Sequence, residues 1–487
     1  MISSPTGGIR NRLYYGDCLR IMQQLNHDSV DLIYLDPPFK SDRDYNSIYK
    51  DETGRPLPDQ IQAFTDTWNY TTDTEKALRN TKIKMLTSGL TDTQIKMWEG
   101  FTKGLKAFDD EMLAYVVYMA ERILEMWRVL KDTGSIYLHC DPSASHYLKI
   151  IMDIIFSQKN FLNEIIWHYT GGGRSKRYFS RKHDVIFWYS KGNRYTFNVD
   201  SVRIPYKKTS GYAKSGITAK SGKHYMPHPS GTPVDDVWDI PIINPMSKER
   251  IGYATQKPLE LLTRIIKASS NEGDVVLDPF CGCATTIEAA HRLKRQWMGI
   301  DIAIHAINRV SRDRLKNRIN LDEEKDYLIE GIPVSHEGAV DLWKQDPFEF
   351  QKWAIEQVEG LPTDRKTGDG GIDGRIFFEV PNHSDLQSML LEVKGGKSVN
   401  VNILRDLRGV LDRENEWMAG LILLHKLSDR KRKNFEKEIA TAGFVEINGK
   451  SYPRMQILTI DEILDGRSFN IPGYARGRSS TAELRLL

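Results

Sequence analysis

The chain has 487 residues, which is enough for two or three domains of ordinary size. Its formal net charge of +3 is only mildly basic, so any affinity for a polyanion must come from local patches of Lys and Arg. Four cysteines, the lack of an apolar run long enough to cross a bilayer and the lack of a recognisable signal peptide exclude a membrane protein and predict a cytoplasmic location.

An apolar run, DLIYL, leads directly into the tetrapeptide Asp36-Pro37-Pro38-Phe39. Prolines hold φ near about −65° and lack backbone donors, so the Asp36 carboxylate and the Pro37 carbonyl form a stiff pair of acceptors. Such a pair can hold both N–H groups of an exocyclic amine and localise its lone pair, while Phe39 stacks on a base that has been flipped out of a duplex. Taken alone, the motif is equally compatible with an ordinary strand and a proline turn.

A second motif, in residues 271–290, predicts a strand, a turn and the start of a helix, as in a nucleotide-binding unit. The strand is expected over residues 275–277, and the next apolar strand, over residues 297–300, ends at Asp301, which suits two ribose hydroxyls. A GxGxxG fingerprint is absent, which argues against NAD and for S-adenosylmethionine. The turn contains the candidate cofactor residues Asp278, Pro279, Phe280 and Gly282.

The motifs DPPF and LDPFCGCATT, with TQKPLELLTRII (255–266) before the second, resemble the amino-methylating DNA methyltransferases in the permuted β arrangement. The resemblance implies a Rossmann-like, S-adenosylmethionine-dependent α/β domain that acts on double-stranded DNA. Asp36, Pro37, Pro38 and Phe39 would be its catalytic motif. Asp278, Pro279, Phe280 and Gly282 would hold the methionine end of the cofactor, Asp301 the ribose and Asp17, in YYGDCL, the adenine. Gln256, Lys257 and Pro258 would close the cofactor pocket.

Two details of these motifs bear on specificity and on metal binding. DPPF favours adenine N6 as the target within this family, and cytosine N4 remains the alternative. Cys283 and Ala284 stand where the family usually has other small residues. Cys281 and Cys283 form a CxC without a second pair, so we expect packing rather than a metal site.

Between the two motifs, strands are expected at SIYLH (135–139) and HDVIFWYS (183–190), with a turn and an amphipathic helix between them. Residues 170–245 are expected to recognise the target sequence, and residues 50–110 form a polar insertion with a helical pattern towards its end. Basic and aromatic residues alternate in GGGRSKRYFSRK (171–182), a composition that suits phosphates and unstacked bases. The candidate DNA-binding residues are Arg174, Lys176, Arg177, Arg181 and Lys182.

The last third of the chain predicts a separate α/β domain. An amphipathic helix in DPFEFQKWAIEQVEG precedes GIDGRIFFEV and MLLEVKGGK, which read as two strands of a hairpin. Glu392 and Lys394 alternate on one strand face, and the partner strand can bring Asp373 beside them. Two carboxylates can hold Mg²⁺, and the lysine can stabilise the charge that develops on a phosphate.

The D…ExK pattern, with GIDG before it, resembles the Mrr-like PD-(D/E)XK restriction endonucleases over residues 345–465. The resemblance implies Asp373 and Glu392 as Mg²⁺ ligands and Lys394 as a catalytic residue, with Glu356 as a weaker acidic candidate. We expect a methyltransferase domain over 11–318, a linker over 319–344, the nuclease-like domain over 345–465 and a tail over 466–487.

Three functions remain open from the sequence. The chain is either a methyltransferase with a cutting domain for restriction-modification, a methyltransferase whose last third only binds DNA or a partner, or a binding protein that is active as neither. The intact motifs argue against the third. A homodimer, or association with a separate restriction or helicase subunit, would be compatible with the first two.

Overall fold

The computed structural model describes residues 11–38, 68, 70–170, 175–207, 210–244, 246–251, 253, 255–304, 306–363, 372–378, 380, 387–447 and 449–472. Along this part of the chain one compact unit ends at Gly331 and a second begins at Ile332. Phe39 and Arg174, both named as candidates above, lie outside the described residues. No helix in the described ranges is long and apolar enough to cross a membrane.

The first unit is built on a nine-stranded sheet with the order β11-β1-β10-β9-β2-β3-β5-β4-β8. β5 runs antiparallel to both of its neighbours, and the other neighbouring strands pair in parallel. The strands are β1 (Asn11–Tyr15), β2 (Val30–Leu35), β3 (Leu130–Cys140), β4 (Phe161–His168), β5 (His183–Ser190), β8 (Val237–Asp239), β9 (Val275–Asp278), β10 (Gln296–Asp301) and β11 (Tyr327–Glu330). The strands predicted at 135–139, 183–190, 275–277 and 297–300 are confirmed.

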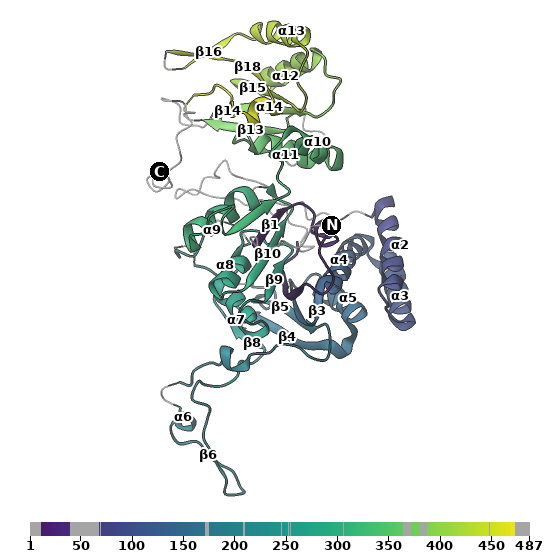
Figure 1. Ribbon diagram of the computed structural model, residues 1–487, viewed down its shortest axis with the longest axis vertical. Coiled ribbons are helices and arrows are strands. Elements are labelled where there is room, and N and C mark those ends of the chain that lie inside the picture. The colour runs from purple at the N-terminus through teal and green to yellow at the C-terminus, as the bar shows by residue number, and fades with distance from the viewer. Residues whose placement is uncertain are drawn as a thin grey trace. The chain divides into compact units, whose positions relative to one another are not determined.

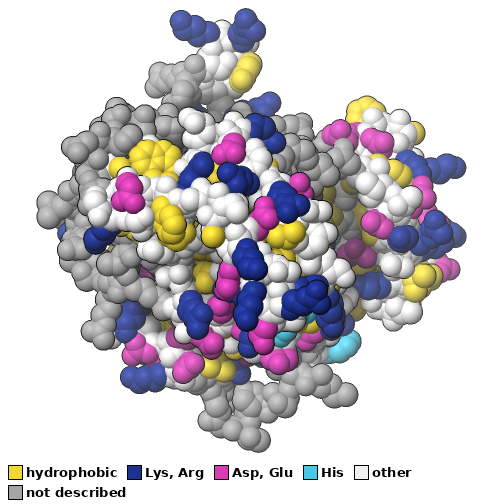
Figure 2. Space-filling model, turned by 90° about the horizontal axis from the view of Figure 1, so that it is seen from above, with side chains coloured by type: hydrophobic (Ala, Val, Ile, Leu, Met, Phe, Trp, Pro, Cys, Tyr) yellow, Lys and Arg dark blue, Asp and Glu magenta, His cyan; other side chains and the backbone are white. Residues whose placement is uncertain are grey.

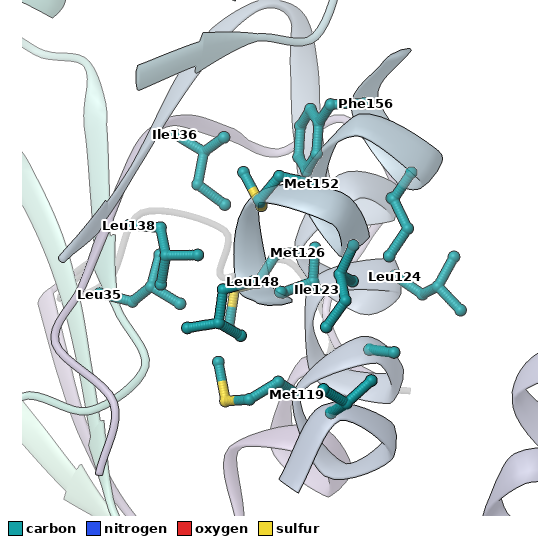
Figure 3. Close-up of a cluster of buried hydrophobic side chains, with 14 of the residues drawn as sticks. Leu35, Met119, Ile123, Leu124, Met126, Ile136, Leu138, Leu148, Met152 and Phe156 are labelled. Atoms are coloured by element: carbon teal, nitrogen blue, oxygen red, sulfur yellow. The ribbon is translucent and has the colours of Figure 1, made fainter. Parts of the chain in front are cut away.

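Helices cover both faces of this sheet (Figure 1). On one face α4 (Asp110–Val129) and α5 (Ser145–Met152) pack over β2 and β3, and α1 (Cys18–Met22) contacts α4 and β10. On the other face lie α7 (Leu259–Ser269), α8 (Thr285–Arg292) and α9 (Arg312–Ile319). Figure 3 shows Leu35 and Leu138, from β2 and β3, facing Met126 of α4 and Leu148 of α5. Because side chains alternate along a strand, the neighbours of Leu35 and Leu138 point to the opposite face.

Two further helices, α2 (Thr72–Thr87) and α3 (Asp92–Phe108), lie in the insertion for which a helical pattern was predicted. Each begins with a capping box, at Thr71 and Thr91, in which the threonine hydroxyl accepts a backbone N–H of the first turn. Their apolar side chains, including the buried Trp98, join the core that α4 and α5 form. The helical end of this insertion therefore extends the layer on the α4 face.

Apart from β5 and β8, the described part of the region expected to recognise DNA has little regular structure. Within it are α6 (Gly211–Ser215), β6 (Ile217–Thr218) and β7 (His224–Tyr225), whose side chains are exposed wherever they are described. Figure 1 shows α6 and β6 on an arm that extends away from β8 and the sheet. Such an arm presents its side chains to solvent on several sides.

The second unit contains a mixed five-stranded sheet with the order β12-β13-β14-β15-β18, in which β13 and β14 form an antiparallel pair. Its elements are α10 (His336–Gln345), α11 (Pro347–Glu356), β12 (Leu361–Pro362), β13 (Gly374–Phe378), β14 (Gln387–Lys394), α12 (Asn402–Arg413), β15 (Met418–Leu423), α13 (Asp429–Ala440), β16 (Phe444–Ile447), β17 (Lys450–Pro453), β18 (Met455–Thr459) and α14 (Ile460–Leu464). The predicted amphipathic helix (α11), the hairpin (β13 and β14) and the α/β class are confirmed for this unit.

Two of the expected boundaries are wrong. The supposed linker over 319–344 contains β11, which pairs in parallel with β1, and most of α10, so the break lies at Gly331 instead. The supposed tail from 466 includes Phe469 and Ile471, which are 3% and 5% exposed. Short strands and isolated apolar side chains give little local signal, and pairing partners far away in the sequence decide whether they are buried.

Candidate active site

Four neighbouring parallel strands of the first unit end beside an aspartate. Asp17 follows β1, Asp301 ends β10, Asp278 ends β9 and Asp36 follows β2. Because β1, β10, β9 and β2 are adjacent and parallel, their carboxyl ends meet at one edge of the sheet. The structure thus brings together the motif predicted to be catalytic and the motif predicted to bind the cofactor, which are more than 200 residues apart along the chain.

Asp36 is a nearly buried carboxylate with one oxygen occupied. Its Oδ2 atom accepts a hydrogen bond from the ammonium of Lys257, and its side chain is 14% exposed. Its Oδ1 atom is buried and has no hydrogen-bond partner among the described residues. An unpartnered buried acceptor is costly in a folded protein, which makes Oδ1 suitable for receiving an N–H group from a ligand. Pro37 and Pro38 follow directly in the chain.

Asp278 has a different environment. It is 3% exposed and accepts the backbone N–H of Phe280 at 3.1 Å. Burial, with a smaller contribution from the nearby charges of Asp36 and Asp301, raises the pKa of Asp278 to about 7, although hydrogen bonds from Thr286 and Phe280 act to lower it. Ionising Asp278 is therefore much harder than ionising an exposed aspartate.

Asp301, at the end of β10, is hydrogen-bonded to the loop that follows β9. Its Oδ2 accepts the N–H of Gly282 at 2.8 Å, and its Oδ1 accepts the N–H of Ala303 at 2.8 Å. Gly282 has φ +47°, and a Cβ added there would lie 3.2 Å from the Tyr253 ring. The left-handed backbone and the close approach of Tyr253 both favour glycine at this position. Phe280 packs against the core of the sheet beside it.

Asp17 is held by two interactions. Its Oδ1 accepts the N–H of Leu19 at 2.7 Å and so caps α1, and its Oδ2 lies 2.5 Å from a guanidinium nitrogen of Arg122 on α4. That guanidinium stacks over the Tyr118 ring, 3.3 Å from its centroid. Arg122 is 4% exposed. The YYGDCL motif gave no sign of this partner.

The segment with Gln256, Lys257 and Pro258 orders a loop next to Asp36. The Gln256 amide accepts the N–H of Ile251 at 3.0 Å and donates to the carbonyl of Glu249 at 2.8 Å. Pro258 stands at the N-cap of α7. With its neighbours fixed in this way, Lys257 is directed at Asp36, a pairing between residues 221 positions apart that the motif alone could not reveal.

The site also contains residues that sequence analysis did not single out. His139, on β3, is 0% exposed, and its Nε2 lies 3.1 Å from Asp184 on β5. The hydroxyl of Tyr34 is 2.9 Å from its Nδ1. In the local sequence, the one sign of the group formed by His139, Asp184 and Tyr34 was a histidine near the end of an apolar strand.

The described part of the basic stretch predicted to contact DNA, residues 175–182, lies between β4 and β5. The Tyr169 N–H donates to the Lys182 carbonyl at 3.0 Å, which closes the loop, and His168 pairs with His183 at its base. Since β4 runs in the same direction as β3, the loop lies at the edge of the sheet that carries Asp36. Lys176, Arg177 and Arg181 are exposed and Lys182 is half-buried, while Tyr178 and Phe179 are 67% and 99% exposed.

Cys281 and Cys283 behave as packing residues. Both are buried, and both are free thiols. Burial raises the pKa of each thiol, and Cys283 contacts Thr285 and Arg314 rather than a second cysteine. The described residues contain no cluster of three or more His, Cys, Asp or Glu able to hold a metal ion.

In the second unit the predicted hairpin brings Asp373, Glu392 and Lys394 together. The Lys394 ammonium lies 2.7 Å from Glu392, and an oxygen of Asp373 accepts the N–H of Val393 at 2.7 Å. Burial raises the pKa of Glu392; Lys394 opposes this shift, and the Asp373 charge adds to it. Asp373 and Glu392 are thus near enough to interact, as a shared divalent cation would require. Glu356 lies at the end of α11.

The charges around this unit are mixed in sign. Figure 2 shows Lys and Arg side chains interspersed with Asp and Glu on the face seen there. Helix α13 follows the same pattern, with exposed cations such as Lys433 and Lys437 beside acids such as Glu436. A large patch of one sign, of the kind that dominates non-specific DNA binding, is not visible on that face among the described residues.

Comparison with known proteins identifies the family. A family model described as DNA methylase (N6_N4_Mtase) matches residues 30–312. Type II methyltransferase M.HpaI from Haemophilus parainfluenzae is 28% identical over 349 residues, 72% of this chain and 87% of that protein. DNA adenine methyltransferase YhdJ from Escherichia coli is 25% identical over 298 residues, 61% of this chain and 80% of that protein. The solved structure of PvuII DNA methyltransferase (cytosine-N4-specific) is 13% identical, covers 65% of this chain and 97% of its own, and has a TM-score of 0.38. Because the family model matches more than half of the chain, this protein belongs to the DNA methylase family.

Proposed function

We propose that the first unit transfers a methyl group from S-adenosylmethionine to the N6 amino group of adenine in double-stranded DNA. The observation that carries this proposal is the buried, unpartnered Oδ1 atom of Asp36, at the same sheet edge as Asp278 and Asp301. Family membership supplies the reaction class.

The residues around Asp36 suit an amine substrate. An exocyclic amino nitrogen is a weak nucleophile, because its lone pair is delocalised into the ring. When Asp36 Oδ1 accepts one N–H and the Pro37 carbonyl accepts the other, the lone pair becomes localised on nitrogen and free to attack. Lys257 holds the second oxygen of Asp36, which fixes the direction of Oδ1. Phe39 is proposed to stack on the flipped base.

The other carboxylates suit a cationic nucleoside cofactor. S-adenosylmethionine supplies an electrophilic methyl group on a positively charged sulfur. We assign its methionine end to the loop of Asp278, Pro279, Phe280 and Gly282, its ribose to Asp301 and its adenine to the neighbourhood of Asp17. The segment Gln256, Lys257 and Pro258 is proposed to close this pocket. The acidic edge favours a cation electrostatically, while Asp278, with its raised pKa, adds little charge below pH 7.

Adenine N6 is proposed over cytosine N4 because the motif is DPPF. YhdJ, described as a DNA adenine methyltransferase, agrees with this choice. The name of M.HpaI, a Type II methyltransferase, supports a role in restriction-modification. Lys176, Arg177, Arg181 and Lys182, with Arg174, are proposed to contact DNA phosphates, since their loop lies at the edge that carries Asp36.

The decisive experiment compares the full chain with Asp36→Ala, using unmethylated DNA and labelled S-adenosylmethionine. Asp36→Ala should lose methyl transfer by about 100-fold or more, because an acceptor for the reacting amine is gone, while cofactor binding persists. Asp132→Ala is the matched control, because Asp132 lies in the same sheet with a side chain that is 89% exposed. Label on N4 of cytosine would select the alternative base. Undiminished transfer by Asp36→Ala would rule out the proposed site.

We further propose that the second unit is a Mg²⁺-dependent DNA endonuclease of the restriction type. The pairing of Lys394 with Glu392, next to Asp373, favours this candidate over a domain that only binds DNA or a partner. Asp373 and Glu392 would hold the ion, which would polarise a phosphate and lower the pKa of a bound water. Lys394 would stabilise the charge that develops on the phosphate.

Cleavage of supercoiled DNA by the full chain, with and without Mg²⁺, tests this second proposal. Asp373→Asn and Lys394→Met should each remove cleavage and leave methyl transfer within about twofold, since they lie in a unit with its own core. Glu446→Gln, an exposed change on β16, should affect neither activity. Cleavage that persists in both active-site variants would show that the nuclease site lies elsewhere, and no cleavage by any chain would favour a binding role.

A further inference from the structure

A fully buried histidine lies behind Asp36 and has no part in the methyl transfer as set out above. His139 is on β3, and its side chain is 0% exposed. Its Nδ1 atom is 2.9 Å from the Tyr34 hydroxyl and 4.0 Å from Oδ1 of Asp36, the oxygen without a partner. Its ring meets the Trp167 ring edge-on, with centroids 5.5 Å apart. The imidazole is therefore enclosed, and one of its nitrogens lies on the side of the reacting carboxylate.

The other nitrogen of His139 is bound to a second carboxylate. Nε2 lies 3.1 Å from Oδ2 of Asp184, whose Oδ1 accepts the Tyr169 hydroxyl at 3.1 Å. Burial acts to raise the pKa of Asp184, but the hydrogen bond and charge of His139, the Lys257 cation and the Tyr169 hydroxyl together hold it below its usual value. Asp184 is thus an ionised carboxylate behind the imidazole, which is the arrangement that orients a histidine and stabilises its cation.

Carboxylates outnumber cations around this ring. A positive charge that arrives on His139 is therefore compensated from several elements of the sheet. The titratable and charged groups that face this region are Tyr34 and Asp36 on and after β2, Asp278 at the end of β9, Asp184 on β5, Tyr169 after β4, Asp141 after β3 and Lys257 before α7.

We propose that the His139–Asp184 pair takes up the proton that methyl transfer releases, by way of Asp36. This inference rests on the proposed function. As the nitrogen–carbon bond forms, the carbon–sulfur bond of the donor breaks and its electron pair stays on sulfur. The methylated amine then loses one N–H proton to Asp36 Oδ1, and the N–H electron pair returns to nitrogen.

The proton then passes from Asp36 Oδ1 to His139 Nδ1. A shift of about 1 Å brings these two atoms from 4.0 Å to hydrogen-bond distance. The Tyr34 hydroxyl, which donates to a neutral Nδ1, turns to accept from a protonated one. His139 does not touch the base, so it is a positioning residue that acts through Asp36.

The competing explanation is that His139 and Asp184 have only a structural role, in which their hydrogen bonds connect β2, β3 and β5. Asp184→Asn separates the two explanations, because asparagine has the size of aspartate but no charge. Its one oxygen can still accept from His139 Nε2, and the Tyr169 hydroxyl can turn to accept from the amide N–H. A structural role would survive this change. An electrostatic role would not.

The test measures single-turnover methyl transfer by the full chain on DNA and, separately, the binding of S-adenosylmethionine alone. His139→Asn and Asp184→Asn should each slow methyl transfer by about 10-fold or more, with cofactor affinity within about twofold of the wild type. Cys140→Ala is the matched control: Cys140 adjoins His139, is equally buried and points to the opposite face of the sheet. It should leave the transfer rate unchanged.

The pH dependence of the transfer rate separates the two explanations further, because a purely structural role of His139 would leave the shape of this pH profile unchanged. His139→Asn should change the shape of this profile, because the proposed acceptor of the released proton is gone. Asp278, whose pKa is raised to about 7, is present in every variant, so it cannot account for a difference between profiles.

The outcomes are distinct. Rates within twofold of the wild type for both variants at every pH would overturn the inference while leaving the proposed methyl transfer intact. A wild-type chain that transfers no methyl group would overturn both. Should His139→Asn fail to fold, as circular dichroism would reveal, the isosteric Asp184→Asn decides the question.

Discussion

Aspartates of the same chemical type are placed in three different environments at the candidate site. Asp36 has a cation on one oxygen and, within the described part of the chain, no hydrogen-bond partner on the other. Asp301 accepts two backbone N–H groups, from Gly282 and Ala303. Asp278 is buried, and its pKa is raised to about 7. The environment therefore gives identical side chains different properties. Asp36 can receive an amine, Asp301 can order a loop, and Asp278 can stay neutral in mildly acidic solution.

The raised pKa of Asp278 makes stability depend on pH. Below about pH 4 the carboxyl is protonated in both states; between about pH 4 and 7 the unfolded chain releases its proton while the folded chain keeps it. Stability therefore falls as pH rises through this window and levels off above it, for a total on the order of a few kcal/mol. Asp278→Asn removes this loss, so without cofactor its stability relative to wild type should increase from pH 5 to pH 8.

Urea unfolding of both chains at these two pH values measures the effect. Asp132→Asn serves as the control, because its side chain is 89% exposed and its substitution should leave the pH dependence of the wild type unchanged. An Asp278→Asn chain whose pH dependence matches that of the wild type would show that Asp278 ionises normally in the folded protein.

Strand pairing at the sheet edge explains where the first unit ends. β11 pairs in parallel with β1, and Gly331 follows it with φ +93°. A Cβ at Gly331 would lie 2.2 Å from the backbone oxygen of Tyr15, so a side chain there has no room. This glycine lets the chain leave the sheet directly beside β1. Because β11 belongs to the sheet, the first unit extends to Gly331, and the expected boundary at 318 was too early.

Gly331→Ala should therefore destabilise the first unit by about 1–3 kcal/mol, since it adds both left-handed strain and a clash with backbone. Gly89→Ala isolates the strain, because Gly89 has φ +80° but no atom within 4 Å of an added Cβ. It should cost about 1 kcal/mol. Urea unfolding compares the two variants, and equal losses would mean that the contact with Tyr15 relaxes freely.

Each unit has its own buried core. In the first, apolar side chains of β2, β3, α4 and α5 form one cluster, and in the second, those of β14, β15, α12 and β18 form another. The proposed activities follow this division, with methyl transfer in the first unit and cleavage in the second. Separate cores are the physical condition for domains that fold independently.

A chain that ends at Gly331 should therefore fold and keep methyl transfer within about threefold of the full chain, with no Mg²⁺-dependent cleavage. The measurement is methyl transfer together with circular dichroism on the shortened chain. A chain ending at 318 is the control and should be less stable, because it lacks β11 and leaves the edge of β1 unpaired. An insoluble 331-residue chain would show that the second unit is needed for folding.

Predictions from the sequence succeeded where the signal is local. Apolar runs with flanking turn residues placed β2, β3, β5, β9 and β10 correctly, because the alternation and length of a strand are properties of neighbouring residues. The prediction that Asp373 meets Glu392 and Lys394 also rests on two adjacent strands, and the structure pairs those strands as expected. Boundaries defined by distant pairing, as for β11 and Phe469, were missed.

The amino-acid sequence by itself pointed to the DNA methylase family, because the motifs around Asp36 and Asp278 each lie within a few consecutive residues. The partners of those groups come from other strands and helices: Lys257 for Asp36, Arg122 for Asp17, and Asp184 for His139. Such pairs form only when the sheet and the helices that cover it assemble and bring these side chains to one edge of the sheet. Charge and burial at the site, and hence its pKa values, are therefore properties of the folded chain.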